Sequence, residues 1–264
     1  MKSLLIKAFL TITCLTLLVS CDRQQDQNTP KEITELNNRV NEMQQEQRLI
    51  LKEVISLQKK LDSILASNQF KPQGAAGRSN KTITLPNIER LQGDDNAEYA
   101  IVEFMDYQCP YCIRYATQVL PTLKQQYVDS GKLKYGIRDY PLSFHSKAEG
   151  AAIAANCAGK QSEYWPMHDE LVDNFKNLSG DLYQTSAKKL NLNIEDFSAC
   201  LDDPEMKQAV VADLAYAAEV GVRGTPNFYI GKIDGDSIIN TVQLTGARSL
   251  EEFDRAIQQA MSVK

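Results

Sequence analysis

Two cysteines two residues apart, in Cys109-Pro110-Tyr111-Cys112, directly follow an apolar, strand-like run at residues 100–105. Proline favours the first position of a helix, so a helix is expected to begin directly after Cys109. The free N–H groups and the positive dipole end of this helix would favour the Cys109 thiolate. We therefore expect a strand-to-helix junction carrying a reversible dithiol, with Cys109 as the attacking sulfur and Cys112 as the resolving partner.

The same Cys-x-x-Cys spacing also occurs in zinc sites, where four ligands surround the metal. The sequence contains no second Cys-x-x-Cys pair and no Cys/His doublet that could complete such a site. We therefore expect no metal ion. No separate cofactor is expected either, because the cysteine pair itself carries the redox equivalents.

The N-terminal segment is typical of an exported protein. Lys2 and Lys7 provide positive charge, and the apolar run at residues 8–19 is too short to span a membrane comfortably. The run ends in Leu-Val-Ser-Cys at residues 18–21, which resembles a bacterial lipobox and predicts that Cys21 is lipidated. The alternative is an ordinary cysteine near an ordinary cleavage site. A chain anchored in this way would face the oxidising periplasm, where disulfide chemistry persists.

A heptad pattern begins at Ile33, and no proline or glycine interrupts residues 31–69. Counted from Ile33 as position a, the seam is apolar except for Gln47, with Ile33, Leu36, Val40, Met43, Ile50, Val54, Leu57, Leu61 and Ile64 at positions a and d. This period predicts a coiled coil that joins two or three copies through residues 33–64. A helix folded back on its own domain is the alternative.

The remaining residues predict one α/β domain with an inserted helical subdomain at about 146–220. Strands are expected near 82–85, 100–105, 133–139, 227–230 and 241–244, and further helices at 110–130 and 250–262. The expected order along the chain is therefore a signal peptide at 1–20, a spacer at 21–30, a coiled-coil helix at 31–69, a linker at 70–81 and the α/β domain at 82–264.

Four segments in this domain resemble DsbA-like thioredoxin-fold oxidoreductases in their residues and in their order. They are the cysteine segment at 104–112, Arg-Asp-Tyr-Pro-Leu at 138–142, the stretch at 151–169 with Tyr-Trp-Pro-Met-His-Asp, and Gly-Val-Arg-Gly-Thr-Pro at 221–226. The resemblance implies a thioredoxin fold with a helical insertion and thiol–disulfide exchange on exported proteins. With the heptads and the lipobox, the chain is most similar to the membrane-associated, oligomeric (Com1-like) branch of that family.

The resemblance also implies roles for further residues. The Thr225-Pro226 bond matches the cis-proline loop that faces the active site, and an X-Pro bond is the peptide that adopts cis at modest cost. A loop backbone held there would bind substrate beside Cys109, together with the intervening Pro110 and Tyr111. Glu103 matches a buried acid that relays the proton of Cys112, whereas an outward-facing, exposed acid is the alternative.

Two further cysteines and two histidines have structural interpretations. Cys157 and Cys200 are expected to form a disulfide in an oxidising compartment; the alternative is two buried free thiols, or one thiol that pairs with a substrate. His145 and His168 are expected to be helix-end or core histidines that bond to the backbone rather than catalytic bases.

Taken together, these features predict a thiol:disulfide oxidoreductase that forms or isomerises disulfides in exported proteins. A membrane redox partner would recycle its dithiol. A formal net charge of −5 and the lack of a basic cluster argue against nucleic acid as a partner. The alternative from another class is a scaffolding lipoprotein in which the coiled coil is the working part and the thioredoxin-like domain is a binding module.

Overall fold

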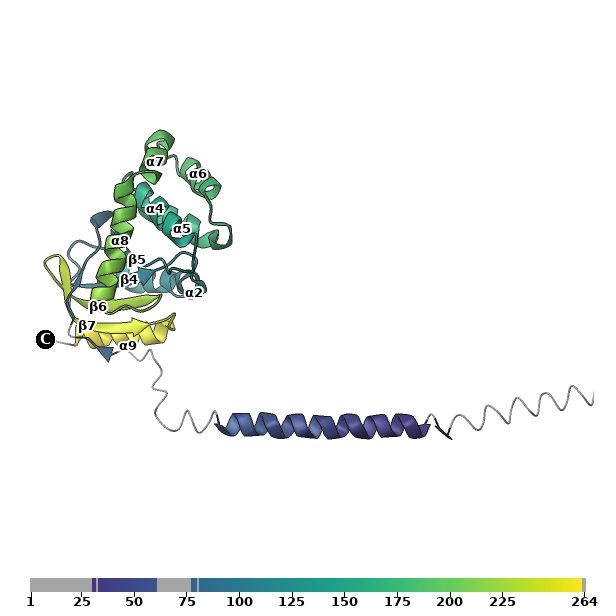
Figure 1. Ribbon diagram of the computed structural model, residues 1–264. Coiled ribbons are helices and arrows are strands. Elements are labelled where there is room, and N and C mark those ends of the chain that lie inside the picture. Colours follow the sequence, from purple (N-terminus) through teal and green to yellow (C-terminus); the bar gives the residue numbers. More distant parts are fainter. Residues whose placement is uncertain (1–29, 32, 61–76, 80, 263–264) are drawn as a thin grey trace, which may run out of the picture. The chain divides into compact units, whose positions relative to one another are not determined.

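The structure is a computed structural model that describes residues 30–31, 33–60, 77–79 and 81–262 (Figure 1). The chain divides into two compact units, residues 1–71 and 72–264. The expected signal peptide, Cys21 and the end of the heptad segment at 61–69 lie outside the described residues. Across the described part of the chain, no helix is both long enough and apolar enough to cross a membrane.

The described residues of the first unit form a helix over residues 33–60, as the uninterrupted heptads predict. Its side chains are exposed along the whole described length. The apolar a and d residues are between 37% and 63% exposed, and they are Ile33, Leu36, Val40, Met43, Ile50, Val54 and Leu57. The described part of this unit therefore carries an apolar stripe that its own side chains leave open to solvent.

The described residues of the second unit form a seven-stranded sheet with β4 (Tyr99–Met105) at its centre. The order is β1-β7-β6-β4-β5-β3, and β2 also pairs with β7. β4 runs parallel to β5 and antiparallel to β6. The other strands are β1 (Gly77–Arg78), β2 (Ile83–Thr84), β3 (Leu91–Gln92), β5 (Leu133–Asp139), β6 (Asn227–Asp234) and β7 (Ser237–Thr245).

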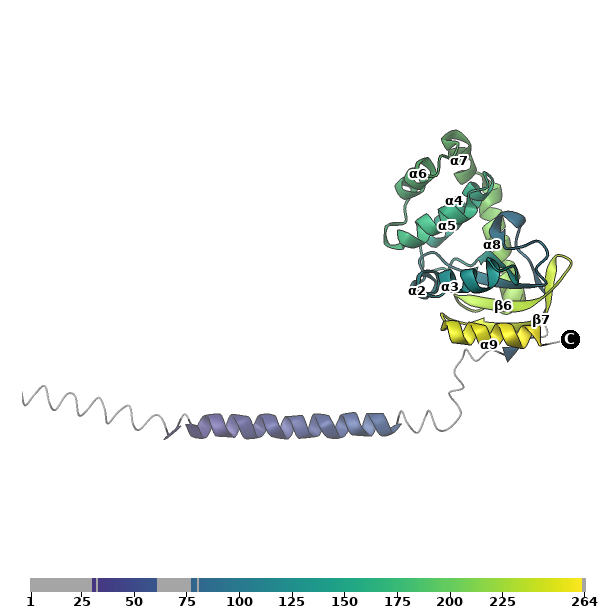
Figure 2. The same ribbon diagram turned by 180° about the vertical axis from the view of Figure 1, so that it is seen from behind.

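Helices cover both faces of this sheet. Because side chains alternate along a strand, Ile101 and Met105 of β4 pack towards α2, α5 and α9, whereas Val102 and Phe104 pack towards α8. Figures 1 and 2 show α4 to α7 gathered as one block, with α8 running from this block to the sheet. The helices are α2 (Pro110–Gln118), α3 (Leu120–Leu123), α4 (Ala148–Gly159), α5 (Tyr164–Asp173), α6 (Gly180–Lys189), α7 (Ile194–Leu201), α8 (Pro204–Glu219) and α9 (Leu250–Met261), with single turns η1 (Ile88–Arg90), η2 (Lys124–Val128) and η3 (Phe175–Asn177).

Three local features differ from the expected elements. The helix expected at 110–130 is divided after α2, because Pro121 has no N–H to continue the hydrogen-bond ladder and its ring crowds the preceding turn. The segment expected as a linker contains β1, so the sheet begins before residue 82. The short elements η1 and β3 were not predicted, since elements of two or three residues carry no readable periodicity.

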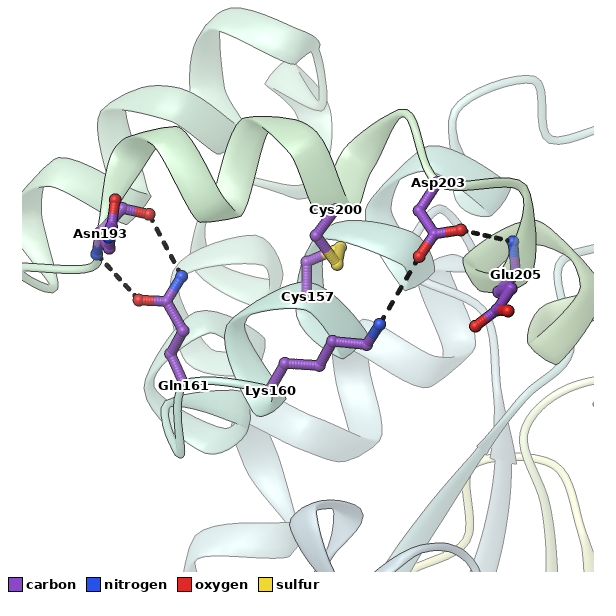
Figure 3. The surroundings of a disulfide bond; sticks show 7 residues. All are labelled: Cys157, Lys160, Gln161, Asn193, Cys200, Asp203 and Glu205. Carbon is purple, nitrogen blue, oxygen red and sulfur yellow. Dashed lines mark hydrogen bonds and ion pairs between the residues drawn. A yellow bond between two sulfur atoms is a disulfide. The ribbon is translucent and has the colours of Figure 1, made fainter.

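A disulfide between Cys157 of α4 and Cys200 of α7 holds the helical insertion together (Figure 3). The side chain of Gln161 supports the same junction, because its oxygen accepts the N–H of Asn193 at 2.8 Å and its amide donates to the Asn193 carbonyl at 3.2 Å. The insertion is thus cross-linked by a covalent bond and by two hydrogen bonds between the Gln161 side chain and the Asn193 backbone.

A buried charge network joins the insertion to the sheet. The Arg90 guanidinium of η1 lies 3.0 Å from Asp139 of β5 and 2.7 Å from Asp213 of α8. Arg138 also pairs with Asp213, at 2.5 Å, and Asn156 of α4 donates to Asp139 at 2.8 Å. Pairing of this kind is what allows charged groups to be buried at an interface between elements.

Candidate active site

Cys109 is the N-cap of α2, and Pro110 occupies the first helical turn, as the cysteine motif predicts. Both cysteines are free thiols, with Cys109 3% exposed and Cys112 fully buried. Tyr111 between them is 55% exposed. The pair therefore lies just under the protein surface, and an exposed aromatic ring marks its position.

The two thiols differ in acidity. The pKa of Cys109 falls from its usual 9.0 to about 5, first because the Cys112 thiol bonds to it. Burial acts in the opposite direction, while contacts with Thr225 and with the amides of Cys112 and Tyr111 lower this pKa further. Burial raises the pKa of Cys112 well above its usual range. Cys109 is thus the thiolate of the pair near neutral pH and Cys112 the thiol.

The loop before β6 faces this thiolate. The Thr225-Pro226 bond is cis, and Cys109 Sγ lies 3.6 Å from the Thr225 carbonyl oxygen. β6 begins directly after the proline, and its first residue, Asn227, pairs with Phe104 of β4. The sheet therefore holds the loop and the cysteine motif side by side although they are more than 100 residues apart in the chain.

Glu103 lies inside the protein and is only 2% exposed, so the alternative of an outward-facing acid is wrong. It shares a face of β4 with Ile101 and Met105, which points it towards α2 and its cysteines. The Tyr135 hydroxyl donates to Glu103 Oε2, while Oε1 accepts no hydrogen bond from the described residues. Burial is the first cause that raises the pKa of Glu103 from 4.5 to about 8.

The raised pKa of Glu103 predicts a pH-dependent stability change in a Glu103→Gln variant. Between pH 4.5 and about 8 the unfolded chain ionises this group while the folded protein keeps it protonated, so the free energy of unfolding falls as the pH rises. The variant lacks this fall. Over that window, its free energy of unfolding relative to that of the natural protein should therefore increase by a few kcal/mol, which is the free energy that corresponds to the pKa shift of Glu103.

Urea unfolding of the reduced protein at several pH values measures this difference. Comparison with the natural protein also cancels the opposite contribution of Cys109, whose lowered pKa adds stability as the pH rises. Glu98→Gln, at an exposed position just before the same strand, is the matched control and should show no such trend. An equal trend in both variants would contradict the assignment of a buried, protonated Glu103.

The two histidines bond to side chains rather than to the backbone, which corrects the expectation for both. His168 is a core residue, 2% exposed, and its Nδ1 lies 3.1 Å from the Tyr107 hydroxyl. Burial lowers the pKa of His168 to about 3, so this ring is neutral. His145 bonds to the carboxylate of Asp106, three residues before Cys109. No sequence pattern assigned a role to Asp106, although it lies within the cysteine segment at 104–112.

Comparison with known proteins agrees with this geometry. Residues 87–259 match the family described as Thioredoxin. A probable disulfide bond formation protein D of Bacillus cereus is 31% identical over 153 residues, which cover 54% of this chain and 70% of that protein. The crystal structure of alpha-DsbA1 from Wolbachia pipientis has a TM-score of 0.59 at 27% identity and covers 67% of this chain and 92% of that one.

Another set of relatives is much longer than the match. The Na(+)/H(+) antiporter NhaA of Herminiimonas arsenicoxydans is 32% identical over 145 residues, which cover 55% of this chain but only 22% of the antiporter. The chain therefore spans about a fifth of the length of these transporters, and the likeness concerns one part of them. The match at residues 87–259, the cysteine pair at the start of α2 and the cis-proline loop together show that this chain belongs to the thioredoxin family, among its DsbA-like disulfide oxidoreductases.

Proposed function

We propose that this protein catalyses thiol–disulfide exchange on exported proteins, forming disulfides and isomerising incorrect ones. The observation that carries the proposal is the asymmetric thiol pair, in which the pKa of Cys109 is lowered to about 5 beside a buried, protonated Cys112. Stabilising the thiolate of the reduced form makes the disulfide form a better oxidant. No metal or other cofactor takes part in the proposed reaction.

The proposed oxidation of a substrate proceeds by two thiol–disulfide exchange steps. A substrate thiolate attacks Cys109 Sγ of the oxidised pair, the bond to Cys112 breaks, and Cys112 leaves as a thiolate that takes up a proton. A second substrate thiolate then attacks the substrate sulfur of the mixed disulfide, and Cys109 leaves as a stable thiolate. The substrate loses two electrons and gains a disulfide, and the cysteine pair gains the two electrons. In isomerisation, the Cys109 thiolate instead attacks an existing substrate disulfide.

Glu103 is the proposed proton carrier for Cys112. Its buried carboxyl shares a face of β4 with residues that pack on α2, its pKa is raised to about 8, and its Oε1 accepts no hydrogen bond from the part of the chain that the structure describes. An acid with a pKa near the working pH both donates and accepts readily. The Tyr135 hydroxyl fixes the other oxygen, so the carboxyl group is held in one orientation.

The substrate is proposed to bind as an extended segment beside the Thr225-Pro226 loop. A backbone held next to the nucleophile pairs with an extended peptide through main-chain hydrogen bonds and needs no particular substrate sequence. Pro110 and the exposed ring of Tyr111, which directly follow Cys109 in the chain, are proposed to complete this surface. This arrangement suits a protein that acts on many exported substrates.

The proposed location is the bacterial cell envelope, with the protein held at a membrane by lipid on Cys21 and facing the periplasm. The lipobox-like residues 18–21 and the preceding apolar run support this proposal. A membrane redox partner would return the cysteine pair to its working state after each cycle.

The reduction potential of the Cys109–Cys112 pair tests the proposed function. A thiol pKa of about 5 lies between those of thioredoxin and of the strong oxidant DsbA, so we expect a potential between about −270 and −120 mV. Equilibration with glutathione buffers measures it, and a parallel assay follows the oxidation of a reduced protein substrate. A potential below that of thioredoxin, with no exchange in either direction, would contradict the proposal.

We also propose that two or three copies associate through the heptad segment at 33–64, of which the structure describes the helix at 33–60. The exposed apolar stripe supports this, because a surface of that kind is stable in water only when another surface covers it. The heptad spacing favours similar helices as the cover. Several cysteine pairs would then act in one assembly, which suits isomerisation as well as oxidation.

Ile50→Glu should convert this assembly into monomers, because it places a charge in the apolar seam at a d position. Lys52→Glu, at an outward f position of the same helix, is the matched control and should leave the assembly intact. Deletion of residues 31–67 should also give monomers. Light scattering or sedimentation measures the mass, and an unchanged mass for Ile50→Glu would refute a seam along this stripe.

A further inference from the structure

The Asp106 carboxylate connects the nucleophile to a second loop. Asp106 follows β4 directly and is 1% exposed. Its Oδ1 accepts the N–H of Gln108 at 2.7 Å and that of Cys109 at 3.2 Å. Its Oδ2 accepts the N–H of Leu142 at 2.7 Å. One carboxylate therefore joins the β4–α2 loop, which carries Cys109, to the β5–α4 loop at residues 140–147.

His145 completes this arrangement. Its Nδ1 lies 2.7 Å from Asp106 Oδ2. Because backbone N–H groups make both carboxylate oxygens acceptors, the imidazole contact is favourable only when Nδ1 carries the proton and donates. Gln108 adds a second connection between the loops, since its side-chain oxygen accepts the Lys147 N–H. Four groups of the described residues thus donate hydrogen bonds to the Asp106 carboxylate. Three are backbone N–H groups, and the fourth is the side chain of His145, which is 18% exposed.

The location of this carboxylate affects the chemistry of Cys109. The Asp106 carboxylate, bonded to the Cys109 amide, lies at the N-terminal end of α2. Its negative charge there partly neutralises the positive end of the helix dipole and disfavours a second negative charge on Cys109 Sγ. The N–H of His145 offsets part of that charge. Removal of the carboxylate and removal of its histidine donor should therefore move the acidity of Cys109 in opposite directions.

We propose that Asp106 and His145 are positioning residues for Cys109: the carboxylate holds the amide of the nucleophile in place, and the histidine donor reduces the charge that the carboxylate presents to the thiolate. A change in the β5–α4 loop would then alter the acidity of the Cys109 thiol through His145, although His145 does not contact the substrate sulfur. The expected effect on exchange activity rests on the proposed function, whereas the expected effect on the pKa of the Cys109 thiol does not.

The titration of the Cys109 thiolate by its ultraviolet absorbance in the reduced full chain tests the inference. Asp106→Asn should lower the thiol pKa by about one unit, as expected for one charge at short range in a partly screened site, and His145→Ala should raise it by up to that amount. In the double variant, His145→Ala should add nothing to Asp106→Asn, because the histidine acts through the carboxylate. The equilibrium with glutathione should shift about tenfold in the matching directions.

Two further variants distinguish the loss of the histidine donor from a folding defect. His145 borders a surface cavity of about 500 Å³, so shortening its side chain leaves no sealed void. His145→Asn supplies an amide N–H in place of Nδ1–H and should restore the thiol pKa, which a loss of packing alone would not do. Ser143→Ala, at an exposed position in the same loop, is the matched control and should match the natural protein.

The outcomes separate this inference from the proposed function. Shifts of His145→Ala and Asp106→Asn in the same direction, or no shift in His145→Ala, would overturn the inference even if exchange activity is intact. Opposite shifts, rescued by His145→Asn, would support it even if no exchange of substrate is detected, because the thiolate is measured without substrate.

Discussion

Cys109→Ser is expected to lose thiol–disulfide exchange by a factor on the order of 1,000 or more, both in the oxidation of a reduced substrate and in the repair of a scrambled one. A serine hydroxyl does not ionise near neutral pH and forms no mixed disulfide, whereas the Cys109 thiol has a pKa of about 5. Exchange assays in both directions measure the loss.

Cys112→Ser is the matched variant for this experiment. It should keep the attacking thiolate and accumulate mixed disulfides with substrate, because the resolving thiol is absent. In cells, a Cys109→Ser protein that keeps full function would contradict the enzymatic proposal and favour the scaffolding lipoprotein. Accumulation of mixed disulfides in Cys109→Ser rather than in Cys112→Ser would reverse the two assigned roles.

Replacement of both Cys157 and Cys200 by alanine is expected to lower the free energy of unfolding by about 4 kcal/mol. The disulfide closes a loop with a sequence separation of 43, and a loop of that length restricts the unfolded chain by about this amount in the entropy model. Urea unfolding in a Cys109→Ser/Cys112→Ser background measures the effect, because only the structural disulfide then remains.

Two controls accompany this measurement. Reduction of the same background protein should lower its stability by a similar amount, which separates the loss of the bond from the change of side chain. The double alanine variant in the natural background should retain exchange, since both cysteines lie in the helical insertion, on α4 and α7, and the catalytic pair lies on α2. A stability loss under about 1 kcal/mol would show that the unfolded insertion is already compact without its cross-link.

The main strands and the active-site junction were predictable because local patterns encode them. The strand at 99–105 is a largely apolar run and the strand at 133–139 alternates apolar residues with others, both over an ordinary strand length, and a proline after the first cysteine marks the start of α2. The heptads likewise predicted the helix at 33–60. Thr225-Pro226 was placed beside the cysteines by resemblance rather than by pattern, because a contact between residues so far apart leaves no local trace.

The partners of the polar residues were not predictable in the same way. His145 and His168 were expected to bond to the backbone, yet they bond to Asp106 and to Tyr107. The burial of Glu103 was one of two alternatives, because the sequence shows which residues share a face of a strand but not which face is covered. The charge network around Arg90 joins elements that are distant in the chain, so no spacing reveals it.

The sequence by itself determined the reactive dithiol, the strand and helix that present it, the apolar seam of the N-terminal helix and the cysteines available for a cross-link. These depend on the chemistry and periodicity of neighbouring residues. Only the tertiary structure decided that Glu103 is buried, that the Thr225-Pro226 loop lies against Cys109 and that Asp106 connects Cys109 to His145. The physical reason is that burial and long-range hydrogen bonds depend on which surfaces meet, and surfaces meet only when the whole chain packs.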